Sequence, residues 1–192
     1  WLAGEGVPEN SALAIAQTPD GYMWLGSSGG LLRFNGSEFK PIGELEPFPK
    51  PNAVVISLNV DRSGRLWAST DEGLLVRESR GWRTLSPTNL IARTIAEDST
   101  GQVWMGTYDG TLFRVEGGEL KPAMGVALPP GTLEKSGVFL VHDPAAGRLW
   151  LANRGFVGYW TGQAWERMGP ETTPPMSIVA GPARGGGLWV YE

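Results

Sequence analysis

Four aspartates recur along the chain in a setting where carboxylates could do chemistry. Carboxylates bind divalent cations and exchange protons as general acids or bases. Each of these four stands close to a glycine, at matching positions of separate repeats, and Asp beside Gly is a common composition of tight turns. The pattern therefore favours turn structure over a metal or acid/base cluster. The four residues are Asp20, Asp61, Asp98 and Asp143.

The remaining reactive residue types are scarce. His142 is the only histidine and cysteine is absent, which excludes a multi-histidine metal site, thiol catalysis and disulfides within this sequence. The glycine run at Gly185 to Gly187 has no following Lys-Ser/Thr pair, so it is no phosphate loop. The residues give no sign of an enzyme, and we expect no catalytic residue, no metal and no cofactor.

A second group of residues has chemistry suited to binding. Three asparagines stand just before apolar segments at equivalent places, and a tyrosine, an aspartate and an arginine fall in short loops. Polar groups in variable loops on a regular scaffold often bind ligands, although helix or turn capping is the alternative for each asparagine. The candidate ligand-binding residues are Asn10, Asn52, Asn89, Tyr108, Asp109 and Arg154.

The elements that must position these residues follow from a repeated Gly-x-x-Trp pattern. Its members lie roughly 37 to 46 residues apart, the length that one four-stranded sheet with its turns consumes. The glycines provide tight turns and the tryptophans are large enough to fill the space between one sheet and the next. The pairs are Gly21/Trp24, Gly64/Trp67, Gly101/Trp104, Gly147/Trp150 and Gly186/Trp189.

Each repeat divides into four short strands, with no sustained helical period between them. We predict an all-β chain, a β-propeller of four-stranded antiparallel blades in one domain over residues 1–192. The blades are expected at 10–42, 52–85, 90–122 and 136–168, with a partial blade at 176–192 and residues 1–5 as an outer strand of a preceding or closing blade. Four complete blades with partial ones at both ends indicate part of a larger propeller.

The tryptophans could also form a row that stacks on sugars, but their place in the second strand of each blade favours the core. A second aromatic follows fifteen residues after the key tryptophan at Phe39, Trp82 and Trp165. Trp160 is additional in its repeat. We therefore expect it to be more available for a surface role than the others.

Composition excludes several classes of protein. The 28 glycines and 15 prolines fit many turns, and 41% hydrophobic residues support a packed core and not a disordered chain. The net charge of −4 and scattered basic residues argue against a nucleic-acid partner. No stretch is long and apolar enough to span a membrane, so we expect no membrane contact from this segment.

Three segments together resemble the two-component regulator propeller repeat. They are Asn10 to Gln17 with Asp20 to Gly36, Asp61 to Leu75, and Asp98 to Arg114. The resemblance implies one or two seven-bladed propellers in the extracytoplasmic, commonly periplasmic, sensor region of a bacterial receptor. It further implies an output kinase or diguanylate cyclase, dimerisation through the full-length receptor, and a carbohydrate-like or other small ligand. No catalytic residues accompany the repeat.

If the chain binds such a ligand, propeller geometry places it on the face made by two sets of loops. These loops join one blade to the next and join the second strand to the third; the latter set includes Thr107 to Asp109 and Asn153-Arg154. Two alternatives stay open. One is a propeller enzyme resembling streptogramin lyase, whose chemistry uses histidine, acidic residues and a divalent metal, against which the single histidine argues. The other is a protein interaction platform.

Overall fold

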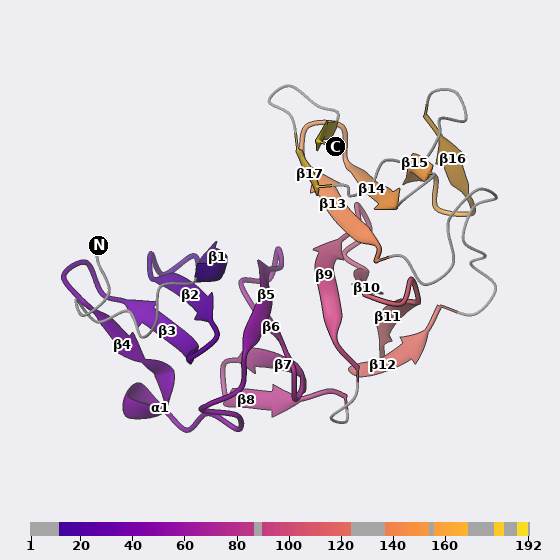
Figure 1. The fold of residues 1–192 in the computed structure, drawn as a ribbon. Coiled ribbons are helices and arrows are strands. Elements are labelled where there is room, and N and C mark those ends of the chain that lie inside the picture. The colour runs from indigo at the N-terminus through magenta and orange to yellow at the C-terminus, as the bar shows by residue number, and fades with distance from the viewer. Residues whose placement is uncertain are drawn as a thin grey trace. The chain divides into compact units, whose positions relative to one another are not determined.

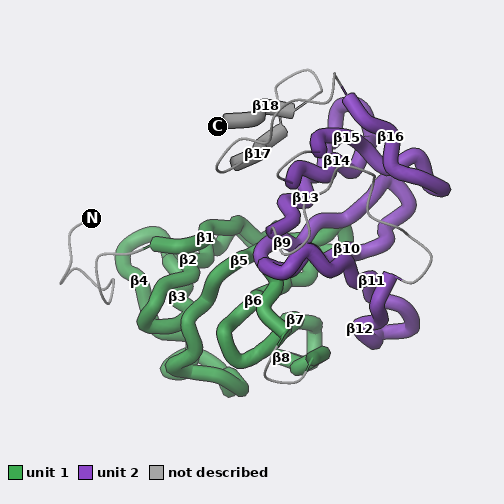
Figure 2. Tube along the Cα trace, turned by 45° about the vertical axis from the view of Figure 1, so that its right-hand side comes forward, with its two compact units in different colours: residues 1–92 green, residues 93–192 purple. Residues whose placement is uncertain are grey.

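A computed structural model describes residues 12–86, 90–123, 137–153, 156–168, 179–182 and 188–191, with the backbone alone for the last two segments. The chain divides into two compact units, residues 1–92 and 93–192, which Figure 2 colours separately. Each unit is built from antiparallel sheets in which strands pair with their neighbours in sequence. No helix in these segments is long and apolar enough to cross a membrane.

The first unit contains two four-stranded sheets and one short helix (Figure 1). The first sheet consists of β1 (Ala12–Gln17), β2 (Met23–Ser27), β3 (Gly30–Phe34) and β4 (Phe39–Pro41), followed by α1 (Ile42–Leu45). The second consists of β5 (Val55–Val60), β6 (Leu66–Thr70), β7 (Gly73–Glu78) and β8 (Gly81–Thr84). The sequence did not predict α1, a single turn that lacks a side-chain cap; Ile42 at its start is buried.

The second unit also contains two four-stranded sheets and adds a pair of strands. Its strands are β9 (Ala92–Glu97), β10 (Val103–Thr107), β11 (Leu112–Glu116) and β12 (Glu119–Pro122), then β13 (Phe139–Asp143), β14 (Arg148–Asn153), β15 (Phe156–Trp160) and β16 (Trp165–Arg167), and finally the pair β17 (Val179–Pro182) and β18 (Leu188–Tyr191). The predicted all-β chain of four-stranded antiparallel sheets is confirmed. The single domain over residues 1–192 stays a prediction.

The turns between the first two strands of the sheets need the conformational freedom of glycine. Gly21, Gly64, Gly101 and Gly147 have φ angles of 88°, 79°, 86° and 61°, in the left-handed region that side chains with a Cβ rarely occupy. Gly186 lies outside the described residues.

The key tryptophans lie in the core and pack against the next sheet of their unit. Trp24 of β2 joins a cluster with Val55, Leu66 and Leu75 of the second sheet, and its ring lies 6.2 Å from that of Trp82. Trp67, Trp104 and Trp150 are likewise buried, whereas for Trp189 only the position in β18 is described.

The second unit reproduces the same packing. The ring of Trp104 in β10 lies 6.2 Å from that of Trp165 and shares a cluster with Leu140 and Leu151. Because the indoles of Trp24 and Trp104 fill the space toward the following sheet of their unit, these tryptophans fix the stacking of the two sheets and are unavailable as a ligand platform.

Close backbone contact between neighbouring inner strands depends on small residues. A Cβ placed on Gly26 of β2 would lie 2.7 Å from Cγ1 of Val55, and one on Gly106 of β10 would lie 3.0 Å from Cγ1 of Val138. Glycine two residues after the key tryptophan therefore makes room for the valine that begins the next inner strand.

Candidate functional site

The loop end of the second unit brings together residues from three segments. In an antiparallel meander, the start of the first strand and the loop between the second and third strands lie at the same end of the sheet. Arg93 is the second residue of β9, Tyr108 and Asp109 lie in the loop between β10 and β11, and Phe139 begins β13 of the next sheet.

Arg93 is held between two aromatic rings. Its guanidinium carbon lies 4.0 Å from the ring centroid of Phe139 and 5.2 Å from that of Tyr108. A Cβ on Gly137 would lie 2.8 Å from Cδ of Arg93 and overlap a terminal nitrogen, so glycine leaves room for the guanidinium in its observed position. The arrangement fixes a positive charge through cation–π contacts and close packing.

A hydroxyl bridge holds the two inner strands together beside Arg93. Oγ1 of Thr94 donates to the carbonyl oxygen of Val138 at 3.0 Å and accepts the amide hydrogen of Leu140, also at 3.0 Å. Phe139 lies between these two bonded residues, so the position of its ring under Arg93 is fixed by the backbone of β13. Arg93 and Phe139 are thus mounted on strands, whereas Tyr108 and Asp109 belong to the β10–β11 loop.

Tyr108 and Asp109 form the exposed side of the site. Tyr108 keeps 49% of its surface exposed, a large area for stacking on a planar or ring-shaped ligand. Asp109 accepts hydrogen bonds from the Thr107 hydroxyl and from the amide of Thr111, 3.2 Å away. The hydroxyl bond is the main reason that the pKa of Asp109 lies below its usual value. Asp109 is therefore ionised at neutral pH, and its hydrogen bonds shape the loop that presents Tyr108.

Of the other predicted binding residues, the structure describes Asn52 alone. Asn52 is exposed in a turn before β5 of the first unit. Asn10, Asn89 and Arg154 lie outside the described residues. The sequence prediction missed Arg93, although a signal was present: it is the charged residue at a strand position where other repeats have Leu13, Ile56 and Phe139.

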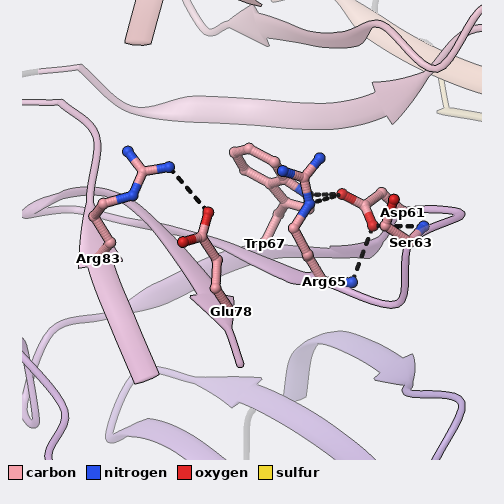
Figure 3. A network of polar contacts seen from close by, with 6 residues as sticks. All are labelled: Asp61, Ser63, Arg65, Trp67, Glu78 and Arg83. Atoms are coloured by element: carbon pink, nitrogen blue, oxygen red, sulfur yellow. Dashed lines mark hydrogen bonds and ion pairs between the residues drawn. The ribbon is translucent and has the colours of Figure 1, made fainter. Parts of the chain in front are cut away.

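The recurrent aspartates bind their own chain. The carboxylate of Asp61 accepts hydrogen bonds from Nε1 of Trp67 at 2.9 Å, from the amides of Ser63 and Arg65, and from Nε of Arg65 at 2.6 Å (Figure 3). Asp98 likewise accepts from Nε1 of Trp104 at 2.8 Å. These two carboxylates anchor the key tryptophan of their sheet to the preceding turn. Their hydrogen bonds support the prediction that the recurrent aspartates form turn structure and not a metal or acid/base cluster.

The predicted equivalence of Asp20 with these residues is wrong. In the first sheet Nε1 of Trp24 donates to Oγ1 of Thr18 at 2.8 Å, and the Thr18 hydroxyl donates in turn to Asp20. Thr18 stands six residues before its tryptophan, as Asp61 does before Trp67, whereas Asp20 lies two residues further along the turn.

The fourth sheet lacks this hydrogen bond. Asp143 accepts from the amides of Ala145 and Ala146, in the turn that one extra residue enlarges. The buried Nε1 of Trp150 has no hydrogen-bond partner among the described residues. The insertion thus separates the carboxylate from the indole that it would otherwise bind.

Trp160 takes part in packing, although it is only half-buried and lines a concavity of the second unit, so a surface role stays a prediction. Its ring lies 5.3 Å from both Trp104 and Trp165. In β15 it pairs with Trp165, just as Arg77 of β7 pairs with Trp82, and Arg77 stacks 5.4 Å from Trp24. Trp160 therefore occupies the position of the arginine that covers the preceding tryptophan in the first unit.

A concavity that the sequence did not indicate lies at the opposite end of the second unit. It encloses about 350 Å³ and is lined by turn residues of both complete sheets, including Ser99, Thr100, Arg148 and Tyr159. The Tyr159 hydroxyl donates to Oε2 of Glu166 at 2.6 Å, and this bond raises the pKa of Tyr159 above its usual value. The guanidinium carbon of Arg148 lies 4.3 Å from the centroid of the Tyr159 ring, so Arg148 and Glu166 both contact Tyr159 at the lining of the concavity.

The family pattern described as "Two component regulator propeller" matches the chain at residues 6–29 and 86–109. A search of curated proteins gave no significant match. These two matches establish that the chain carries two-component regulator propeller repeats, as the sequence resemblance predicted.

Solved structures share the fold. The extracellular domain of the putative hybrid two component system BT3049 from B. thetaiotaomicron is 19% identical, with a TM-score of 0.73 over 98% of this chain and 26% of that one. Virginiamycin B lyase from Staphylococcus aureus, in a catalytically inactive form with quinupristin, is 15% identical, with a TM-score of 0.69 over 98% of this chain and 64% of the lyase. The chain thus corresponds to part of larger propeller chains, and the expected β-propeller class is confirmed.

Proposed function

We propose, starting from the two-component regulator propeller repeats of this chain, that it is a noncatalytic ligand-binding part of a bacterial sensor. Its place would be outside the cytoplasm, in a receptor that passes the signal to a kinase or cyclase. The ligand is carbohydrate-like and contacts the loop end of the second unit. The observation that carries the proposal is the exposed ring of Tyr108 beside the clamped Arg93.

Stacking on an aromatic ring suits a sugar because the C–H face of a pyranose is apolar while its edge carries hydroxyls. Tyr108 offers the ring face, and the neighbouring Arg93 offers hydrogen-bond donors. The noncatalytic part of the proposal is supported by the fate of the recurrent aspartates, since Asp61 and Asp98 hold buried indoles and turn amides.

The test is binding of a panel of neutral and acidic oligosaccharides to the protein that contains this chain, by thermal shift and then by calorimetry. We expect at least one glycan to raise the Tm and the Tyr108→Ala variant to lose about tenfold in affinity, the scale of one aromatic contact. Arg83→Gln, on β8 of the first unit and outside the candidate binding residues, serves as the control and should bind normally. A panel without any Tm shift, or unaltered binding by Tyr108→Ala, would overturn the proposal.

A second candidate function is lyase chemistry, favoured by the fold likeness to virginiamycin B lyase. It has a direct assay: incubation of the protein with quinupristin and a divalent metal, followed by mass spectrometry. Turnover would favour the lyase. Binding of a protein partner but of no glycan would instead favour an interaction platform.

A further inference from the structure

We infer that Arg93 makes the loop-end site selective for a ligand that carries a carboxylate. This inference rests on the proposed function and sharpens it: among carbohydrate-like ligands, the site would take an acidic sugar in preference to a neutral one. The inference follows from the environment of Arg93 and from the contrast with the other arginines of the described chain.

Four arginines in the described segments form an ion pair with a carboxylate of the fold. The ion pairs with arginine are Arg65 with Asp61, Arg77 with Glu46, Arg83 with Glu78 and Arg114 with Glu116. Arg93 differs from these four because its contacts within the described chain are the two aromatic rings and the packing against Gly137, without an ion pair or hydrogen bond to a described residue. Arg33 and Arg148 also stack on aromatic rings, but Arg93 is the one beside the exposed ring of Tyr108.

The aromatic contacts leave the guanidinium chemically available. A guanidinium is planar, and its five N–H donors lie in the plane, at the edges and not on the faces. The rings of Phe139 and Tyr108 contact the guanidinium, and Gly137 packs against one of its terminal nitrogens. The remaining donors can pair with the two oxygens of a carboxylate, the bidentate geometry for which arginine is best suited.

The neighbouring carboxylate does not take this role. Asp109 is ionised, but its described hydrogen bonds go to Thr107 and Thr111 of its own loop. Its negative charge at the rim also disfavours ligands of high negative charge, because like charges repel at short range. The site therefore suits a single carboxylate attached to a ring that stacks on Tyr108.

Immobilisation of the Arg93 side chain increases the binding free energy that its contact with a carboxylate provides. An arginine that must be ordered on binding loses side-chain entropy, whereas Arg93 is already held by rings fixed on β13 and the β10–β11 loop. The structure thus presents a preorganised cationic group at the place where the proposed ligand would bind.

The experiment compares a probe that carries a single carboxylate with its neutral ester: galacturonic acid and its methyl ester, titrated into the protein by calorimetry at fixed ionic strength. We expect the free acid to bind about tenfold tighter or more. In Arg93→Gln this ratio should fall close to one, and in Arg93→Lys it should fall partway, because an ammonium keeps the charge and loses the bidentate geometry. Arg83→Gln, which removes an exposed paired arginine, is the matched control and should keep the ratio of the unmodified protein.

The outcomes separate the two proposals. Equal affinity for acid and ester in the unmodified protein would overturn the carboxylate inference while leaving glycan binding intact. A ratio that persists in Arg93→Gln would overturn it as well, by assigning the selectivity to another cation. Failure of every glycan to bind would refute the proposed function itself. The ratio in the unmodified protein tests the inference even if a substitution prevents folding.

Discussion

Replacement of Asp61 gives the sharpest test of how the blades are held together. Its side chain is wholly inaccessible, and four donors converge on its carboxylate: two backbone amides, Nε of Arg65, and Nε1 of Trp67 (Figure 3). The indole has 0% exposure, so it has no access to solvent once the acceptor is removed. The two amides belong to a turn at the surface, where water can replace part of the lost bonding.

The magnitude follows from these donors. A buried donor left without an acceptor costs about 1–3 kcal/mol, and loss of a buried charged partner raises the total. We expect Asp61→Ala to reduce the free energy of unfolding by about 3–5 kcal/mol. Asp61→Thr restores the arrangement that Thr18 makes with Trp24 in the first sheet, and it should cost about half as much. Glu78→Ala breaks an exposed ion pair with Arg83 and should cost below about 1 kcal/mol.

The assay is urea unfolding of the three variants and the unmodified protein, followed by tryptophan fluorescence and circular dichroism. The free energies are comparable if the m-values agree, since m reports the surface exposed on unfolding. We expect the loss of stability to decrease in the order Asp61→Ala, Asp61→Thr, Glu78→Ala. A cost of Asp61→Ala no larger than that of Glu78→Ala would refute the inference that the carboxylate anchors the buried indole.

Two further predictions concern the first unit. Hydrogen bonds from Arg77, at 2.7 and 3.0 Å, are the main cause that holds the pKa of Glu46 below its usual value of 4.5. Ionised Glu46 therefore stabilises the fold above that pH, and this contribution is lost as the pH falls below it. In urea titrations at several pH values, Glu46→Gln should be less stable than the unmodified protein at pH 7, and the difference in unfolding free energy should close on acidification; a difference independent of pH would contradict this. Gly26→Ala should lower the free energy of unfolding by about 1–3 kcal/mol because the new Cβ would lie 2.7 Å from Cγ1 of Val55. Adding Val55→Ala to the same chain should recover part of the loss of Tm. The absence of any recovery would assign the destabilisation to the backbone and not to the Val55 side chain.

Local features of the fold could be predicted because they depend on short stretches of sequence. Gly21 and Gly64 mark turns that need a positive φ, and the residues after them alternate or run apolar as strands do. The burial of Trp24 and Trp67 followed from their period, because a large aromatic repeated once per sheet has to fill the space between sheets.

Contacts between separate turns and sheets were harder to predict. Asp20 stands beside a turn glycine and was therefore grouped with Asp61. However, Nε1 of Trp24 donates its hydrogen bond to Thr18, because the residue six positions before the tryptophan is the one placed against the indole on the second strand. Trp160 has no counterpart tryptophan in the other repeats, and its role depends on Trp104 of the preceding sheet. Neither relation is encoded in a local pattern.

The sequence by itself determined the all-β class, the four-stranded repeat and the turns, because these are set by backbone preferences and by periodic burial within each repeat. Tertiary structure decided the candidate site. Arg93 and Phe139 belong to different sheets, and their 4.0 Å contact exists only because β9 and β13 pack side by side, held by the Thr94 hydroxyl. A charged residue in a strand gives no indication of which rings will enclose it until the sheets are stacked.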